Sequence, residues 1–291
     1  MMLVNLGIVV TLSLIMSFLG VGHYMRPYGL DVQSLAIFCL IWGMGASFMS
    51  LLISKWIAKF MYGVQVIDPN SANGAAHNLY VMVERAAQSA GLPRVPEVGI
   101  YDSAELNAFA TGPSRGNALV AVSTGLLNSM SESEIEGVIG HEITHVANGD
   151  MVTMTLLQGV VNAIVMFVSR IVAYGAAQAV RGDRERGSNP FVYTIVLILT
   201  QLVLGFAGII VVSWFSRRRE FRADAGSAHI FGREKMIGAL RALENRSRYF
   251  DPRGAQMASF KISTRPVGGL MTLFATHPSI EERIAALSTQ V

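Results

Sequence analysis

The stretch Val138–Asp150, VIGHEITHVANGD, contains His141, Glu142 and His145 in the pattern His-Glu-x-x-His. Residues four apart share one face of a helix, so both imidazoles point the same way. Tetrahedral zinc accepts two such imidazoles. Glu142 is turned from its neighbour by about 100°, where its carboxylate can reach a metal-bound water. The pattern arises by chance in roughly one chain in a hundred, so it favours a zinc site.

The residues around this pattern predict the helix that the zinc site needs. Ser131 can cap the helix, and Glu134, three residues later, can return the bond in a capping box. We expect the helix to run from Glu132 to about Asn148, where Gly149 can end it.

A catalytic zinc usually has three protein ligands and an open position. The strongest candidate for the third ligand is Glu220, in the segment EFRAD. Asp224, one turn later, can accept a hydrogen bond from a zinc-bound histidine and fix its tautomer. The alternative for Glu220 is an ion pair with Arg217 or Arg218 on a solvated helix face. The other histidines are His23, His77, His229 and His277.

The composition predicts an integral membrane protein. The chain of 291 residues is 52% hydrophobic and 15% charged, whereas soluble proteins have about 25% charged residues. Roughly 20 apolar residues cross a bilayer as a helix. Four runs reach that length: Leu3–Gly22, Ser34–Ile53, Thr153–Val180 and Phe191–Phe215. The first run could instead be a signal peptide, although no basic residue precedes it. The last two could form a buried hairpin, since they contain Arg170 and a few polar residues.

The charge distribution predicts the orientation of the chain. The formal net charge is +3, which in a membrane protein does not point to nucleic acid. Basic residues beside the spans prefer the cytoplasmic side, and here they are Lys55, Lys59 and Arg217–Arg219. The opposite loop mixes arginines with acidic residues, so the bias is modest. The single cysteine, Cys39, excludes a disulfide within the chain and fits a reducing compartment.

The four spans divide the chain into alternating membrane and polar parts. The parts are a pair of N-terminal membrane helices (1–54), a first catalytic part (55–152), a membrane hairpin (153–215) and a second catalytic part (216–291). Four spans put both termini and both polar parts on one side. We therefore expect a mainly α-helical membrane protein with a split α/β domain and a small sheet.

Within the polar parts, periodicity and turn residues predict individual elements. The expected helices are Asn73–Ala90, Ser216–Phe231, Arg233–Arg246 and Ser279–Ser288, and the expected strands are Glu97–Tyr101, Asn107–Gly112 and Ala118–Ser123. Residues 247–276 show no clear period and are expected to form a mobile loop.

At this point a resemblance to a known family becomes specific. HEITH, EFRAD after two apolar spans, NAFATG upstream and THP near the end resemble the HtpX-type integral-membrane zinc metalloproteases. These are gluzincins with a zincin-like catalytic domain, and they are relatives of the CAAX prenyl endoproteases. The resemblance covers nearly the whole chain, and the catalytic positions show no departure.

The resemblance implies a role for each matched residue. His141, His145 and Glu220 would bind one zinc ion, Glu142 would be the general base and proton shuttle, and Asp224 would support a ligand. Asn107, Ala108 and Phe109 match the edge strand that pairs with substrate, although from the residues alone they would be a turn and a core position. His277 would lie near the zinc, with a helix cap as the alternative. Arg283 could hold a carboxylate near the site.

These residue types predict hydrolysis without a covalent intermediate, since zinc activates water and Glu142 moves the proton. The resemblance implies quality control of damaged membrane proteins in the bacterial inner membrane, with the catalytic domain and both termini in the cytoplasm. The expected partners are membrane-protein substrates and the lipid bilayer, and the sequence does not give the oligomeric state. Two alternatives stay open: a processing protease of narrow specificity like the CAAX prenyl endoproteases, and a non-catalytic metal-bound membrane scaffold.

Overall fold

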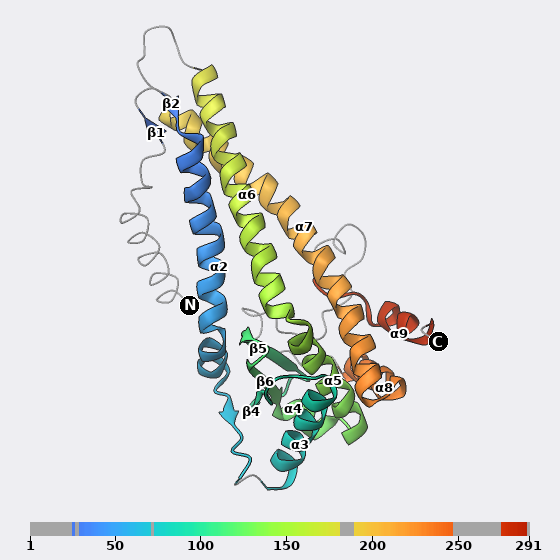
Figure 1. Ribbon diagram of the computed structural model, residues 1–291. Coiled ribbons are helices and arrows are strands. Elements are labelled where there is room, and N and C mark those ends of the chain that lie inside the picture. The colour runs from blue at the N-terminus through green and yellow to red at the C-terminus, as the bar shows by residue number, and fades with distance from the viewer. Residues whose placement is uncertain (1–24, 27–28, 71–72, 181–188, 247–274, 290–291) are drawn as a thin grey trace. The chain divides into compact units, whose positions relative to one another are not determined.

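The computed structural model describes residues 25–26, 29–70, 73–180, 189–246 and 275–289 (Figure 1). The chain forms two compact units, residues 1–50 with 154–212 and residues 51–153 with 213–291. Each unit is therefore built from two separate stretches of the sequence.

Three helices in the described part of the chain are long and apolar enough to cross a membrane. They are α2 (Val32–Tyr62), α6 (Asp150–Ala179) and α7 (Pro190–Phe231). They contain three of the four apolar runs of the sequence. The first run, Leu3–Gly22, lies outside the described residues, so the structure supports three candidate spans.

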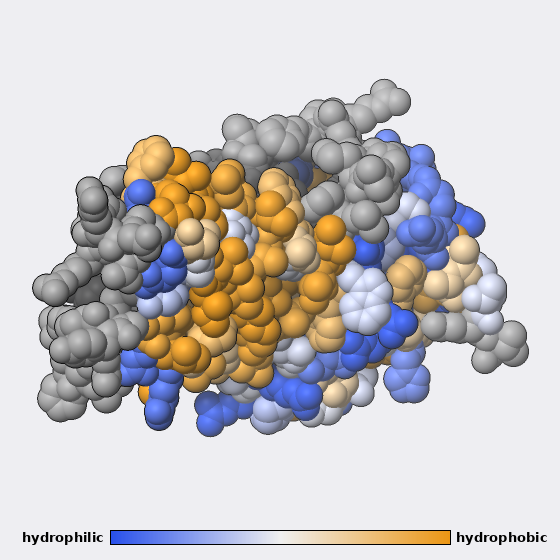
Figure 2. All heavy atoms as spheres, turned by 90° about the horizontal axis from the view of Figure 1, so that it is seen from above, coloured by the Kyte–Doolittle hydropathy of each residue, from blue (hydrophilic) through white to orange (hydrophobic). Residues whose placement is uncertain are grey.

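The first unit has helix contacts that depend on small residues. A side chain at Gly43 of α2 would meet the backbone of Ala163 of α6 at 2.6 Å, so only glycine allows this approach. Large hydrophobic side chains of α2, α6 and α7 point outward, and Figure 2 shows how widely hydrophobic residues cover the surface. Such an apolar exterior is expected of a surface that faces lipid. The charged Arg170 packs its guanidinium over the ring of Phe38, 5.1 Å from the centroid.

The second unit contains a four-stranded mixed sheet. Its strands are β3 (Gln65–Val66), β4 (Glu97–Tyr101), β5 (Ala108–Ser114) and β6 (Asn117–Ser123). They lie in the order β3-β4-β6-β5, with β4 and β6 parallel and the other pairs antiparallel. A separate two-residue pair joins β1 (Met25–Arg26) to β2 (Gly29–Leu30). Strand β5 is thus an edge strand of the larger sheet.

Both faces of this sheet are buried, as the alternating side chains of β6 show. Val120 and Val122 pack into the main core with helices α3 (Gly74–Ser89) and α5 (Glu132–Asn148). Leu119 and Ala121 face the other way, against the end of α2. Residues 118–122 of the strand are therefore all apolar, which is typical of a strand covered on both sides.

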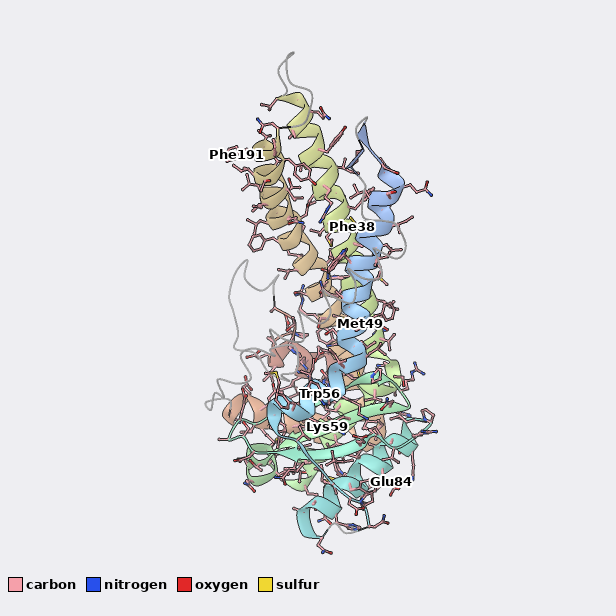
Figure 3. The ribbon with its side chains drawn as sticks, turned by 90° about the vertical axis from the view of Figure 1, so that its left-hand side faces the viewer. Phe38, Met49, Trp56, Lys59, Glu84 and Phe191 are labelled. Carbon is pink, nitrogen blue, oxygen red and sulfur yellow. The ribbon has the colours of Figure 1, made fainter. Side chains whose placement is uncertain are left out.

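Two lysines tie the end of α2 to this sheet. Lys55 donates to Glu97 of β4 at 2.9 Å and to Asn117 of β6 at 2.7 Å. Lys59 lies 2.5 Å from the other oxygen of Glu97. Figure 3 labels Lys59, together with Trp56, at this end of the helix. The last turns of α2 thus belong to the second unit and are bonded to its sheet.

The expected helices are present, with one informative difference. Helix α5 has the expected bounds and the expected capping box of Ser131 and Glu134. Helices α8 (Arg233–Arg246) and α9 (Ile280–Thr289) match their expected positions, and a short helix α4 (Thr124–Ser129) was not expected. A helix was expected to begin at Ser216. In the structure this segment is the last part of α7, which is continuous because neither glycine nor proline lies near Ser216. The loop predicted at 247–276 lies almost wholly outside the described residues.

Candidate metal centre

Helix α5 presents its two histidines side by side, as the spacing predicts. The Nε2 atoms of His141 and His145 lie 3.1 Å apart, and the rings meet nearly edge to face. His141 is buried with 1% of its surface exposed, and the side chain of His145 is 12% exposed. Both reactive nitrogens therefore point to one small region with little access to water.

Glu220 of α7 completes this group. One of its oxygens lies 3.4 Å from Nε2 of His141, and the other lies 3.4 Å from Nε2 of His145. One ligand atom from each of the three residues lies within 4.8 Å of the others. Glu220 is 0% exposed. The structure thus brings together the three residues that the sequence analysis named as ligands.

Small residues allow α7 to approach α5 closely enough for this arrangement. A side chain at Gly226 of α7 would meet the side chain of Thr144 at 2.3 Å, and one at Gly140 would meet Ser227 at 2.6 Å. The hydroxyl of Ser227 donates to the carbonyl of Gly137 at 2.6 Å. A larger side chain at either glycine would move Glu220 away from the histidines.

The outer nitrogens of both histidines bind carboxylates. Nδ1 of His141 lies 2.9 Å from Asp224, and Nδ1 of His145 lies 2.6 Å from Asp150. Asp224 is fixed in turn by Arg283 of α9, whose Nε and Nη2 donate at 2.8 and 2.6 Å. A neutral imidazole that donates from Nδ1 carries its lone pair on Nε2. Both lone pairs therefore point at the same region as Glu220.

These residues fit a bound metal ion. Two ring nitrogens 3.1 Å apart need either a proton or a metal ion between their lone pairs. In addition, Oε2 of Glu220 is buried and has no hydrogen-bond partner, which is costly for a carboxylate unless a cation compensates it. Two imidazoles and one carboxylate form a donor set that suits zinc. The group therefore has the character of a metal site.

The pKa values of these groups reflect burial and close charges. Burial raises the pKa of Glu142 above its ordinary value. Burial also opposes the charged forms of His141 and Asp224, but their partners outweigh it. The nearby carboxylates of Asp224 and Glu220 raise the pKa of His141 to about 9, and Arg283 together with His141 lowers the pKa of Asp224 to about 2. Glu220 overcomes its burial in the same way, because His277 and His145 hold its pKa well below the ordinary value. Negative charge is thus stable where a cation would bind.

Glu142 lies beside the metal-binding group without belonging to it. It is 5% exposed, and the backbone of Ala110 on β5 is close enough to lower its pKa slightly against the larger effect of burial. The carboxylate therefore lies near the edge strand. This position suits a base that acts on a water or on a peptide lying along β5.

The predicted substrate residues lie at the start of β5, and all three are buried. Asn107, Ala108 and Phe109 are 3%, 0% and 2% exposed. The side-chain amide of Asn107 donates to the hydroxyl of Tyr101 at 3.1 Å, and Phe109 packs on the rings of Tyr62 and Tyr101. These two side chains therefore face the aromatic cluster. Only their backbone and that of Ala108 and Ala110 remain as candidates for contact with a substrate.

His277 and Arg283 both lie at the site, as the sequence analysis anticipated. Nδ1 of His277 is 3.0 Å from Oε2 of Glu220, although neither atom is in hydrogen-bonding orientation. His277 is 8% exposed and Arg283 is 1% exposed. The C-terminal helix α9 and the residues before it are thus part of the site.

Sequence reasoning missed Asp150 and Arg219. Arg219 precedes Glu220 and lies 3.3 Å from one of its oxygens. Asp150 follows Gly149, the residue that was predicted to end the helix. A carboxylate placed just after a helix-ending glycine, five residues from a ligand, was a signal that could have identified it.

The sequence of this chain also matches a known protein family. The model of Peptidase family M48 matches residues 75–291, which include every residue of the metal-binding group. This chain belongs to peptidase family M48. The M48 peptidase is accordingly a metalloprotease, and its apolar helices make it a membrane protein.

Close relatives match the M48 peptidase over nearly its full length. A protein named Protease HtpX homolog from Methylacidiphilum infernorum is 48% identical over 98% of this chain and 95% of its own. The homologue from Thiobacillus denitrificans is 50% identical over 97% and 95%, and that from Bacillus licheniformis is 44% identical over 100% and 96%. Such identity over whole chains places this peptidase among the HtpX proteases.

A solved structure shares the fold. The crystal structure of S. mikatae Ste24p superposes with a TM-score of 0.64 at 18% identity. The match covers 98% of this chain and 65% of that protein. The likeness therefore concerns the fold alone, and Ste24p contains a further third that has no counterpart here.

Proposed function

We propose that this M48 peptidase is a zinc-dependent endopeptidase that cleaves damaged or misassembled membrane proteins. One observation carries the proposal: the ligand atoms of His141, His145 and Glu220 lie within 4.8 Å of one another, with the carboxylate of Glu142 beside them. Three protein ligands and an adjacent base are what a hydrolytic zinc site requires.

Each side chain has a distinct part in the proposed reaction. His141, His145 and Glu220 would hold the ion, which when bound would lower the pKa of a water and polarise the scissile carbonyl. Glu142 takes the proton of the attacking water and delivers it to the leaving amine. Its raised pKa favours this exchange, because a more basic carboxylate accepts a proton more readily. Asp224, held by Arg283, fixes the ring of His141 in the tautomer that leaves Nε2 free.

His277 is a further candidate for a role in the reaction. Its ring lies 3.0 Å from Glu220, so it can approach a carbonyl held at the same site. We propose that it donates to the oxygen of that carbonyl as negative charge develops there.

The edge strand β5 offers a way to bind an extended peptide. The carbonyl of Asn107 accepts from the amide of Ser123 on β6, so Asn107 directs its backbone inward. Alternate residues of an antiparallel edge strand direct theirs outward, and these are Ala108 and Ala110. We propose that a substrate strand pairs there through backbone bonds, which demand little of its sequence.

The proposal extends to the membrane arrangement. We propose four transmembrane helices, with Leu3–Gly22 as the first, and a catalytic domain made of residues 55–152 and 216–291. The bacterial HtpX relatives support a place in the bacterial inner membrane, and the basic residues beside the spans favour an orientation with this domain and both termini in the cytoplasm. Glu220 lies on the same continuous helix as the apolar run that ends at Phe215. That spacing of five residues is about 8 Å along a helix and favours substrates near a bilayer.

Hydrolysis of casein by the detergent-purified protein tests the enzyme against a metal-bound scaffold. We expect activity that is lost with a chelator and restored by zinc. Glu142→Gln should reduce it by about 10²–10⁴-fold, the usual value of a general base, while Glu84→Gln on α3 serves as the matched control. Hydrolysis that persists in Glu142→Gln, or in the presence of the chelator, would contradict the proposed mechanism.

A further inference from the structure

Each histidine of the metal-binding group has its own carboxylate, and the two carboxylates are held differently. Asp224, which holds His141, lies one turn beyond Glu220 on α7 and is locked by Arg283. Asp150, which holds His145, is the first residue of α6, the helix that contains the third apolar run. The second histidine is thus oriented from the start of a candidate membrane helix.

The backbone fixes Asp150 in this place. Helix α5 ends at Asn148, and Gly149 takes a left-handed conformation with φ of 69°. The amides of Val152 and Thr153 then bond to the carbonyl of Gly149, which starts α6 immediately. Because a single residue separates the two helices, the side chain of Asp150 is turned back toward His145. A side chain other than glycine at position 149 would strain this turn.

Asp150 is buried close to a positively charged side chain. The residue is 4% exposed, and the amide groups at the start of α6 give that end a partial positive charge. Nε of Arg219 lies 4.0 Å from Asp150, and the same guanidinium lies 3.3 Å from Glu220. Arg219 therefore neutralises two carboxylates that flank His145.

We propose that Asp150 is a positioning residue for the metal ligand His145. By accepting from Nδ1 at 2.6 Å, it holds the ring in the tautomer whose Nε2 faces the metal, and its charge makes that nitrogen a stronger donor. It also makes the first turn of α6 part of the active site. The inference rests on the zinc site of the proposed function.

The alternative is that Asp150 only stabilises the start of α6. Two substitutions and one control separate the two roles. Asp150→Asn keeps the shape and can still accept from Nδ1, but lacks the charge. Asp150→Ala removes the acceptor. Thr153→Ala is the control, because Thr153 is exposed, supports the same turn through Gly149 at 3.2 Å and does not contact His145.

The measurement is the zinc affinity of the full-length protein in detergent, from competition with a chelator of known affinity. Loss of a carboxylate behind a metal-bound histidine typically costs about 10–100-fold in affinity. We expect a loss near the lower end for Asp150→Asn, a larger loss for Asp150→Ala and none for Thr153→Ala. The absorption spectrum of the cobalt-substituted protein should also change in both Asp150 variants, because the imidazole of His145 is a direct ligand.

Unchanged zinc affinity and an unchanged cobalt spectrum in Asp150→Asn and Asp150→Ala would overturn the inference and leave the proposed function standing. An equal loss in Thr153→Ala would also overturn it, since the effect would then come from the helix start. If Asp150→Ala does not fold, Asp150→Asn decides by the same two measurements. Absence of zinc binding by the unchanged protein would contradict the metal site itself, and this inference with it.

Discussion

Arg283 is the largest fully buried side chain in the described part of the protein, and replacing it gives a quantitative test of the site. Its guanidinium makes two short bonds to Asp224, at 2.8 and 2.6 Å. We expect Arg283→Met to destabilise the fold, because it leaves the carboxylate of Asp224 buried without its cation. Arg241→Met is the matched control, since Arg241 is exposed on α8.

The magnitude follows from two estimates. The pKa of Asp224 falls from 3.8 to about 2, and that difference is worth about 2 kcal/mol at 1.36 kcal/mol per unit. Removing one partner of a buried ion pair generally costs about 3–5 kcal/mol. Because His141 still bonds to Asp224, we expect a loss near the lower end, about 3 kcal/mol. For a domain of this size that is a fall of about 6–12 °C in melting temperature.

The assay is thermal unfolding of the zinc-free protein in detergent, which keeps metal binding from adding to the stability. A double variant, Arg283→Met with Asp224→Asn, buries neither charge and should recover most of the lost stability. It should not recover the zinc affinity, since the amide introduced by Asp224→Asn lacks the charge that strengthens His141 as a ligand. A melting temperature within about 2 °C of the unchanged protein for Arg283→Met, or a double variant as unstable as the single one, would refute this reasoning.

Three further predictions follow from the same residues and from the spans. Arg283 and His141 outweigh the opposing effect of burial and together lower the pKa of Asp224 from 3.8 to about 2, so the stability that the Asp224 carboxylate contributes is present above about pH 4 and is lost as the pH falls toward 2; the zinc-free protein should lose melting temperature over this range, and a double variant that loses as much would contradict the assignment. A cleavable sequence placed at increasing distance from a transmembrane anchor in vesicles should be cut fastest close to the membrane, while equal rates at every spacing and for the free peptide would leave the spans with an anchoring role alone. In a variant without Cys39, a cysteine at Ser188 should react with an impermeant thiol reagent on intact cells and one at Gln88 of α3 should not; the reverse result would invert the proposed topology.

Local sequence signals predicted helix α5 well, because each of its ends has a recognisable capping residue. The capping box of Ser131 and Glu134 marks the start of α5, and Gly149 marks its end. The spacing of His141 and His145 then fixes their common face without knowledge of the rest of the fold. Glu220 could be proposed as a ligand only because His141 and His145 leave a catalytic zinc site one protein ligand short.

The remaining features depend on contacts between distant parts of the chain. No local pattern indicates that β4 pairs with β6 in parallel, or that β5 lies at the edge. The sequence does not predict that α7 continues through residues 215 and 216, where apolar residues give way to charged ones. That change alters the solvent around the helix and leaves its backbone unchanged. Asp150 was missed because its role arises from the turn at Gly149 and not from its own helix.

The metal content of two purified variants separates the metal ligand from the catalytic base. Glu142→Gln should keep about one zinc per chain and lose hydrolysis, because Glu142 serves as a base and not as a ligand. Glu220→Gln should lose both, or bind zinc far more weakly, because a neutral amide replaces the carboxylate that lies 3.4 Å from both histidine nitrogens. Full zinc occupancy in Glu220→Gln, or loss of zinc in Glu142→Gln with the fold intact, would contradict the assignment of ligand and base on which this account rests.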